Sequence, residues 1–134
     1  MASRSVSFID IPTAQSQTFG IAELAREFDV TPRALRFYEE EGLIAPTRDG
    51  ATRIYSRRDR VRVALILRGR AMGFSLDEVG ELLNLYDPTD GGARQRAVVA
   101  ERCRAKADEL HRQLAEIQAV IQRLTDFADQ LDGK

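Results

Sequence analysis

The sequence predicts a mainly α-helical protein, with a head of short helices and one small β-hairpin followed by a long C-terminal helix. Three patterns predict this fold. Apolar residues recur every three or four positions in several short segments, as on one face of a helix. An Asp49-Gly50 pair separates two short strand-like segments. Residues 93–132 carry a heptad repeat with no Pro or Gly, which predicts a coiled coil.

Residues 1–17 have no clear periodicity and are rich in Ser, Thr and Gln, so we expect a flexible N-terminal arm. Part of it, 5–11, could pair as a short strand. Asp10 and Pro12 interrupt any apolar core of a secretory signal. No apolar run is long enough to cross a bilayer. We therefore expect a cytoplasmic protein with no membrane partner.

Residues 21–43 predict two short helices joined by a tight turn. Ile21, Leu24 and Phe28 lie on one apolar face of the first helix. Thr31 can cap the second helix, and Pro32 suits its first position because it has no N–H to leave unpaired.

The second of these helices has two different faces. Leu35 and Tyr38 are expected inside, which leaves Arg33, Arg36 and Phe37 outside. Two short helices with an outward pair of arginines predict a helix-turn-helix whose second helix can enter a DNA major groove. The alternative is an ordinary helical hairpin with solvated arginines.

A small β-hairpin follows this unit. Asp49-Gly50 predicts its turn, and residues 52–55 alternate like a strand. Arginines on a hairpin directly after such a helix predict a wing that reaches DNA phosphates or the minor groove.

Two further helices complete the predicted head, residues 18–87. Ser56 and Asp59 have capping-box form, and Ser75 with Glu78 form a full capping box. The first of these helices is expected to bury Val61, Leu65 and Met72, with positions 63, 66 and 67 near the same surface. The second presents its apolar residues at helical spacing, at positions 76, 79, 82, 83 and 86. Residues 88–92 predict a linker.

The heptad seam of residues 93–132 predicts a dimerisation helix, because a lone helix would leave its apolar face in water. Its expected contact residues are Cys103, Ala107, Leu110, Leu114, Ile117, Ile121, Leu124 and Leu131. A second copy of the chain is the expected partner. Cys103 is expected to fill space on the seam, with a reactive thiol as the alternative.

Charge is distributed unevenly along the chain. The formal net charge is −1, yet residues 48–70 hold eight arginines against two acidic residues. Such a basic zone on a nearly neutral chain favours one phosphate-binding surface over a solvated helix face. With one cysteine and one histidine, His111, the sequence gives no sign of a metal site, and we expect no cofactor.

The pieces, in this order, resemble the MerR family of transcriptional regulators. The matching segments are residues 21–25, 33–39, 42–44, 53–56 and 72–78. Residues 84–88 further resemble a branch that controls fatty-acid and branched-chain amino-acid breakdown. Two departures stand out: Ala51-Thr52 precede Arg53 where many members have Gly-Tyr, and the sequence shows neither a cysteine-bearing loop nor a large effector domain after the long helix.

The resemblance implies a winged helix-turn-helix dimer whose long helices pair antiparallel as a coiled coil. It implies binding to a pseudo-palindromic promoter site with distortion at its centre, and a connection to RNA polymerase through the shared promoter. Together with the residue patterns, the resemblance predicts DNA contacts from Thr31, Arg33, Arg36, Phe37, Tyr38, Arg53, Tyr55 and Arg57. For the two tyrosines, a place in the core is an equal alternative. A small-molecule effector is possible and its identity open.

A competing hypothesis is a coiled-coil adaptor whose basic zone is incidental. An enzyme is not expected, because the sequence shows no nucleophile–base pair, Gly-rich phosphate loop or metal cluster.

Overall fold

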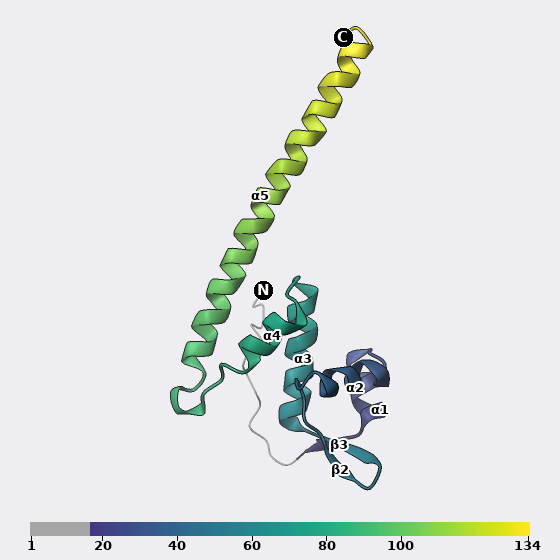
Figure 1. The fold of residues 1–134 in the computed structure, drawn as a ribbon, viewed down its shortest axis with the longest axis vertical. Coiled ribbons are helices and arrows are strands. Elements are labelled where there is room, and N and C mark those ends of the chain that lie inside the picture. The colour runs from purple at the N-terminus through teal and green to yellow at the C-terminus, as the bar shows by residue number, and fades with distance from the viewer. Residues whose placement is uncertain (1–16) are drawn as a thin grey trace, which may run out of the picture. The chain divides into compact units, whose positions relative to one another are not determined.

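The computed structural model describes residues 17–134, so the expected N-terminal arm lies outside the described residues except for Gln17. This part of the chain forms two compact units, one that ends at Arg96 and one that begins at Ala97. The first unit holds the short helices and the strands, and the second holds most of one long helix (Figure 1). The mainly helical fold with a small antiparallel sheet confirms the predicted fold class.

The two predicted short helices are α1 (Ile21–Phe28) and α2 (Pro32–Glu40). Asp29 ends α1 in the left-handed conformation, with φ 54°, which Asp tolerates better than most residues. The Val30 N–H donates to the Ala25 carbonyl at 3.0 Å. This tight turn sends the chain directly into α2.

A three-stranded antiparallel sheet contains the predicted hairpin. Its order is β1 (Thr18–Phe19), β3 (Thr52–Ser56), β2 (Thr47–Asp49). Asp49 pairs with Thr52, so Gly50 and Ala51 form the turn, and Gly50 adopts the positive φ of 63° that such a turn requires. Strand β1 was not predicted, because two residues are too short to show a period.

Both predicted capping boxes are present. In α3 (Arg57–Ala71) the Ser56 hydroxyl accepts from the Asp59 amide at 3.1 Å, and Asp59 accepts from the Ser56 amide at 2.9 Å. The same carboxylate accepts from the Ala45 amide at 2.9 Å, which ties the segment after α2 to α3. Helix α4 (Leu76–Leu83) begins with the equivalent exchange between Ser75 and Glu78.

The predicted inward face of α3 was partly wrong. Its fully buried apolar residues are Val63 and Ile66, whereas Val61 and Leu65 are half-buried and Met72 is exposed. Apolar residues cover more than one side of this helix, so their spacing alone does not select the face. Helix α3 lies between α4 on one side and α1 and α2 on the other in Figure 1.

Helix α4 ends at Leu83, three residues before the predicted end at Tyr86. Within the expected linker, residues 88–92, the structure has a short 3-10 helix, η1 (Pro88–Asp90). The Asp87 carboxylate caps it by accepting from the Thr89 amide at 2.8 Å. Helix α5 (Ala93–Leu131) is continuous. None of the helices in residues 17–134 is long and apolar enough to span a bilayer.

Candidate nucleic-acid interface

Helix α2 separates its side chains as a recognition helix requires. The Thr31 hydroxyl caps it by accepting from the Ala34 amide at 3.0 Å. Leu35 is fully buried and anchors the helix to the head. Its opposite face exposes Arg33, Arg36 and Phe37, whose spacing of three and four residues places them side by side. This face can present two guanidinium groups and an aromatic ring to a duplex.

Glu39, near the C-terminal end of α2, binds both arginines of the hairpin. Its Oε1 accepts from Arg53 Nε at 2.7 Å, and its Oε2 accepts from Arg48 Nη2 at 3.3 Å. The hydrogen bond from Arg53 is the main reason that the pKa of the Glu39 carboxyl lies below its ordinary value. This carboxylate therefore fixes the wing against the recognition helix.

The contact with Glu39 changes the expected role of Arg53. Its side chain is 23% exposed and engaged by Glu39, whereas Arg48 is 49% exposed and makes the longer contact. Arg48 was not among the predicted DNA contacts, although its place directly before Asp49-Gly50 was a usable signal. Of the two, Arg48 is the better placed to reach a phosphate, and Arg53 the better placed to position the wing.

The prediction that Tyr55 contacts DNA was wrong. Tyr55 is fully buried, and burial raises the pKa of its hydroxyl. In a strand, residues two positions apart share a face. Arg53 and Tyr55 therefore point to the same side of β3, toward the helices, and Tyr55 lies deeper. The alternative role in the core is the correct one.

The remaining predicted contacts lie at the edge of this surface. Tyr38 is half-buried, and the centroid of its ring lies 6.3 Å from that of Phe37. A contact between Tyr38 and DNA stays a prediction. Arg57 is half-buried at the first position of α3. Its contact with DNA also stays a prediction.

Several arginines of the basic zone, residues 48–70, make contacts within the head. Arg60 forms a bidentate pair with Glu27 of α1, and its guanidinium lies 5.5 Å over the Phe19 ring. Arg70 donates to the Phe74 carbonyl at 3.0 Å. Arg62 is buried and donates to the Leu43 carbonyl. The sequence had assigned this zone to one external surface, and the structure divides it between inner contacts and the outside.

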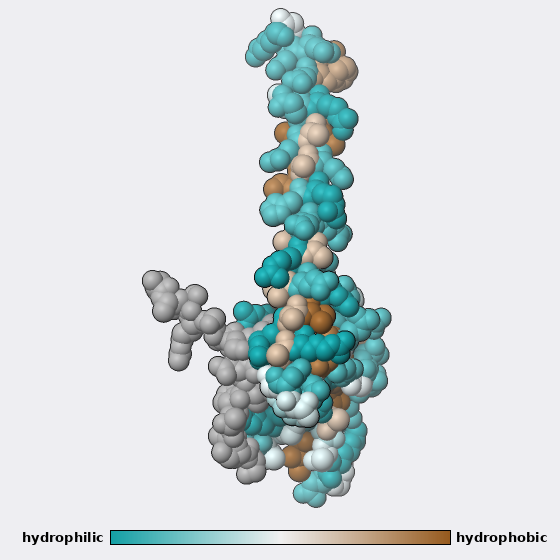
Figure 2. Space-filling model, turned by 90° about the vertical axis from the view of Figure 1, so that its left-hand side faces the viewer, coloured by the Kyte–Doolittle hydropathy of each residue, from teal (hydrophilic) through white to brown (hydrophobic). Residues whose placement is uncertain are grey.

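The predicted dimerisation residues extend along α5. Leu110, Leu114, Ile117, Ile121, Leu124 and Leu131 are 51–72% exposed in the single chain. Apolar side chains interrupt the hydrophilic surface along the rod-shaped helix in Figure 2. Ala107 is exposed and Cys103 is half-buried with a free thiol. The structure of one chain thus leaves the seam uncovered.

Val120 and Phe127 are also exposed, 45% and 60% respectively; Val120 directly precedes Ile121 of the seam, and Phe127 lies between Leu124 and Leu131. They were not predicted as contacts, because they fall outside the strict heptad positions. Within residues 17–134 no group of three or more His, Cys, Asp or Glu side chains is placed to hold a metal ion.

Comparisons with known proteins agree with this architecture. The family model described as "MerR HTH family regulatory protein" matches residues 19–85, and the model "MerR, DNA binding" matches residues 60–127. The HTH-type transcriptional regulator CueR of Salmonella typhi is 34% identical over 116 residues, which cover 84% of this chain and 81% of that protein.

Two solved structures share the fold. The transcription regulator PbrR691 from Ralstonia metallidurans CH34, solved in complex with lead(II), superposes with a TM-score of 0.62 at 31% identity, over 81% of this chain and 83% of its own. HiNmlR, a MerR family regulator lacking the sensor domain and bound to promoter DNA, superposes with a TM-score of 0.55 at 22% identity, over 79% and 80%. These matches support a regulator and give no support to an adaptor. The helix-turn-helix, the wing and the long helix are thus those of a known class, and the chain belongs to the MerR family of helix-turn-helix transcriptional regulators.

Proposed function

We propose that two copies of this chain form a homodimer that binds a pseudo-palindromic promoter site and distorts its centre to control transcription. The observation that carries the proposal is the division of α2, which buries Leu35 and exposes Arg33 and Arg36 on one face. An arginine on such a face can bind guanine O6 and N7 together, which distinguishes guanine from the other bases.

The apolar seam of α5 supports the homodimer. Its six large aliphatic residues are each at least half exposed in one chain. Full burial of such a side chain contributes about 1.5–3 kcal/mol, so the seam is a strong driving force for association. An identical helix offers the same repeat, and the family resemblance gives the antiparallel direction. A dimer with twofold symmetry then requires two half-sites of related sequence.

The wing is expected to contact the backbone beside each recognition helix. Arg48 is the more exposed of its two arginines, so it supplies the phosphate contact in this proposal. Phosphate contacts fix the register of the protein, and the arginines of α2 read the bases.

Distortion of the DNA is the finer part of the proposal. Bending and untwisting a promoter has a cost that depends on its central steps, and contacts at both half-sites offset that cost. A distorted centre would change the alignment of promoter elements presented to RNA polymerase. The branch that controls fatty-acid and branched-chain amino-acid breakdown stays a prediction, as does the place of the protein in the cytoplasm.

Binding sites can be isolated by selecting genomic fragments on the full-length protein and then measured by fluorescence anisotropy. We expect Arg36→Ala to weaken the selected site by about 1–3 kcal/mol more than random DNA of equal length. Arg68→Ala is the matched control, because Arg68 is an exposed arginine of the same head near the C-terminal end of α3. Equal losses on both sequences would show that Arg36 contacts only the backbone.

Two further measurements separate this function from an adaptor. Affinity for DNA should fall steeply as salt rises, because each neutralised phosphate releases counterions. An over-long spacer between promoter elements beneath the selected sites would indicate activation, and an ordinary spacer repression. Failure to retard any genomic fragment at low salt would refute the regulator.

A further inference from the structure

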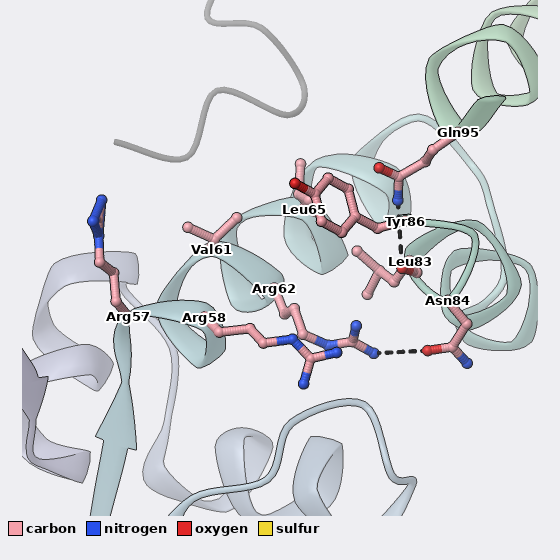
Figure 3. Close-up of a pocket in the computed structure, with 9 residues that line it drawn as sticks. All are labelled: Arg57, Arg58, Val61, Arg62, Leu65, Leu83, Asn84, Tyr86 and Gln95. Carbon is pink, nitrogen blue, oxygen red and sulfur yellow. Dashed lines mark hydrogen bonds between the residues drawn. The ribbon is translucent and has the colours of Figure 1, made fainter. Parts of the chain in front are cut away.

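A pocket of about 320 Å³ lies between α3 and α4, on a part of the head that the recognition helix and the wing do not line. Its apolar walls come from Val61 and Leu65 of α3, Leu83 at the end of α4, and Tyr86 (Figure 3). Gln95, in the first turn of α5, closes one side. The volume is at the lower end of the range of small-molecule sites, about 300–1,000 Å³.

Two guanidinium groups lie together at one end of this pocket. Figure 3 shows the side chain of Arg58 running beside that of Arg62, whereas Arg57 points elsewhere. Arg62 is 7% exposed and donates to two neutral acceptors, the Leu43 carbonyl and, at 3.3 Å, Asn84 Oδ1. Neither acceptor carries a charge.

No carboxylate of the described residues accepts a hydrogen bond from this buried cation. The charge of Asp59 acts on Arg62 through space, while the two Asp59 oxygens accept backbone amides from Ala45 and Ser56. Burial lowers the pKa of Arg62, and the charge of Arg58 lowers it further. An arginine stays protonated nonetheless, so two like charges remain close together in a partly dry site. For Arg58 the described residues provide no hydrogen bond or ion pair.

We propose that this pocket binds a small organic anion, with a carboxylate between Arg58 and Arg62 and an apolar body against Val61, Leu65, Leu83 and Tyr86. A planar carboxylate can accept from both guanidinium groups at once, which relieves their repulsion. The apolar walls favour a hydrocarbon body over an inorganic anion or the bare backbone of DNA.

Hydrogen bonds that hold two of the lining side chains, Arg62 and Gln95, support a preformed site. The side-chain amide of Gln95 donates to the Leu82 carbonyl at 2.7 Å, and Gln95 is 2% exposed. Arg62 in turn is held by the Leu43 carbonyl and by Asn84 at the end of α4. A ligand here would touch α3, the end of α4 and the start of α5 together, without ordering any of them first.

Calorimetric titration of the full-length protein tests this site with defined probes. Octanoate is the probe; octan-1-ol lacks the charge, octylammonium reverses it, and acetate lacks the apolar body. We expect octanoate to bind at least about tenfold more tightly than each of the three, as one charge-assisted hydrogen bond or a few buried methylenes contribute that much. Equal binding of octan-1-ol, or no binding of octanoate, would overturn the proposal.

Two matched variants locate the binding. Arg58→Gln should weaken octanoate about tenfold, because it removes one of the two guanidinium groups. Arg68→Gln removes an exposed arginine of the same helix outside the pocket and should leave the affinity unchanged. Circular dichroism and thermal unfolding would show that both variants fold. Equal effects of the two substitutions would refute the site.

A DNA phosphate is the other possible source of an anion. If Arg58→Gln weakened binding to random duplex and left octanoate unaffected, the two arginines would be a backbone contact and the proposal would be wrong. Because the titration uses protein without DNA, its outcome is independent of whether the chain binds a promoter.

Discussion

Gly69, in the last turns of α3, lies against Val79 of α4, and we predict that replacing Gly69 with alanine is destabilising because of this neighbour. A Cβ at this position would lie 2.7 Å from Cγ2 of Val79, a contact that real structures do not tolerate. Val79 is 3% exposed and β-branched, so in a helix it has essentially one rotamer and cannot turn away. Either the helices separate or the side chain is strained.

The magnitude comes from two opposing effects. Gly→Ala inside a helix gains about 1 kcal/mol from helix propensity. Overpacking a tight core costs about 1–3 kcal/mol. We therefore expect Gly69→Ala to lower the free energy of unfolding by about 1 kcal/mol in the native background. In a Val79→Ala background the clash is absent, so Gly69→Ala should raise the free energy of unfolding by about 1 kcal/mol.

Urea unfolding followed by circular dichroism measures all four proteins of this cycle, at one fixed protein concentration because a dimer's stability depends on it. Gly80→Ala is the matched control: its Cβ would meet one terminal methyl of Leu43 at 3.1 Å, a milder contact, so less overpacking is expected than at Gly69. A coupling between positions 69 and 79 below about 0.5 kcal/mol would refute the close crossing of α3 and α4.

Other consequences can be tested by simple substitutions. Leu114→Asp or Ile117→Asp places a charge on the exposed seam of α5 and should give monomers with poor promoter binding, and sedimentation that showed an intact dimer would contradict the seam. Asp29→Ala should destabilise by about 1 kcal/mol and Asp29→Gly should not, because φ is 54° there; equal unfolding midpoints would refute a role for backbone conformation. Glu39 has a lowered pKa, so its contribution to stability is complete above the ordinary value of 4.5 and is lost as pH falls through the lower folded value. The stability difference between wild type and Glu39→Gln should shrink in that acidic range, and a constant difference would show that the charge is unimportant.

Local chemistry made much of the fold predictable. The cap at Thr31, the boxes at Ser56 and Ser75 and the turn at Gly50 depend on residues only a few positions apart, so the sequence displays them directly. The heptad spacing likewise predicted one unbroken helix, and α5 extends from Ala93 to Leu131.

Contacts between distant segments were not predictable in this way. Arg60 pairs with Glu27, which lies 33 positions earlier, and nothing in either local pattern selects that partner. Tyr55 and Arg53 share a strand face, yet the sequence does not say that the helices cover it. The pocket beside Arg62 likewise depends on how α3 and α4 cross, a tertiary feature that periodicity does not fix.

The two contacts that Glu39 makes with Arg48 and Arg53 also bear on how the protein searches DNA for its site. Because one carboxylate accepts from both wing arginines, its negative charge lies beside the side chains that would approach a phosphate. A carboxylate repels a phosphate, so we expect the wing to attract the DNA backbone less strongly than it would without Glu39. We therefore expect a shorter residence on unrelated DNA, where the arginines of α2 make no base contacts to compensate.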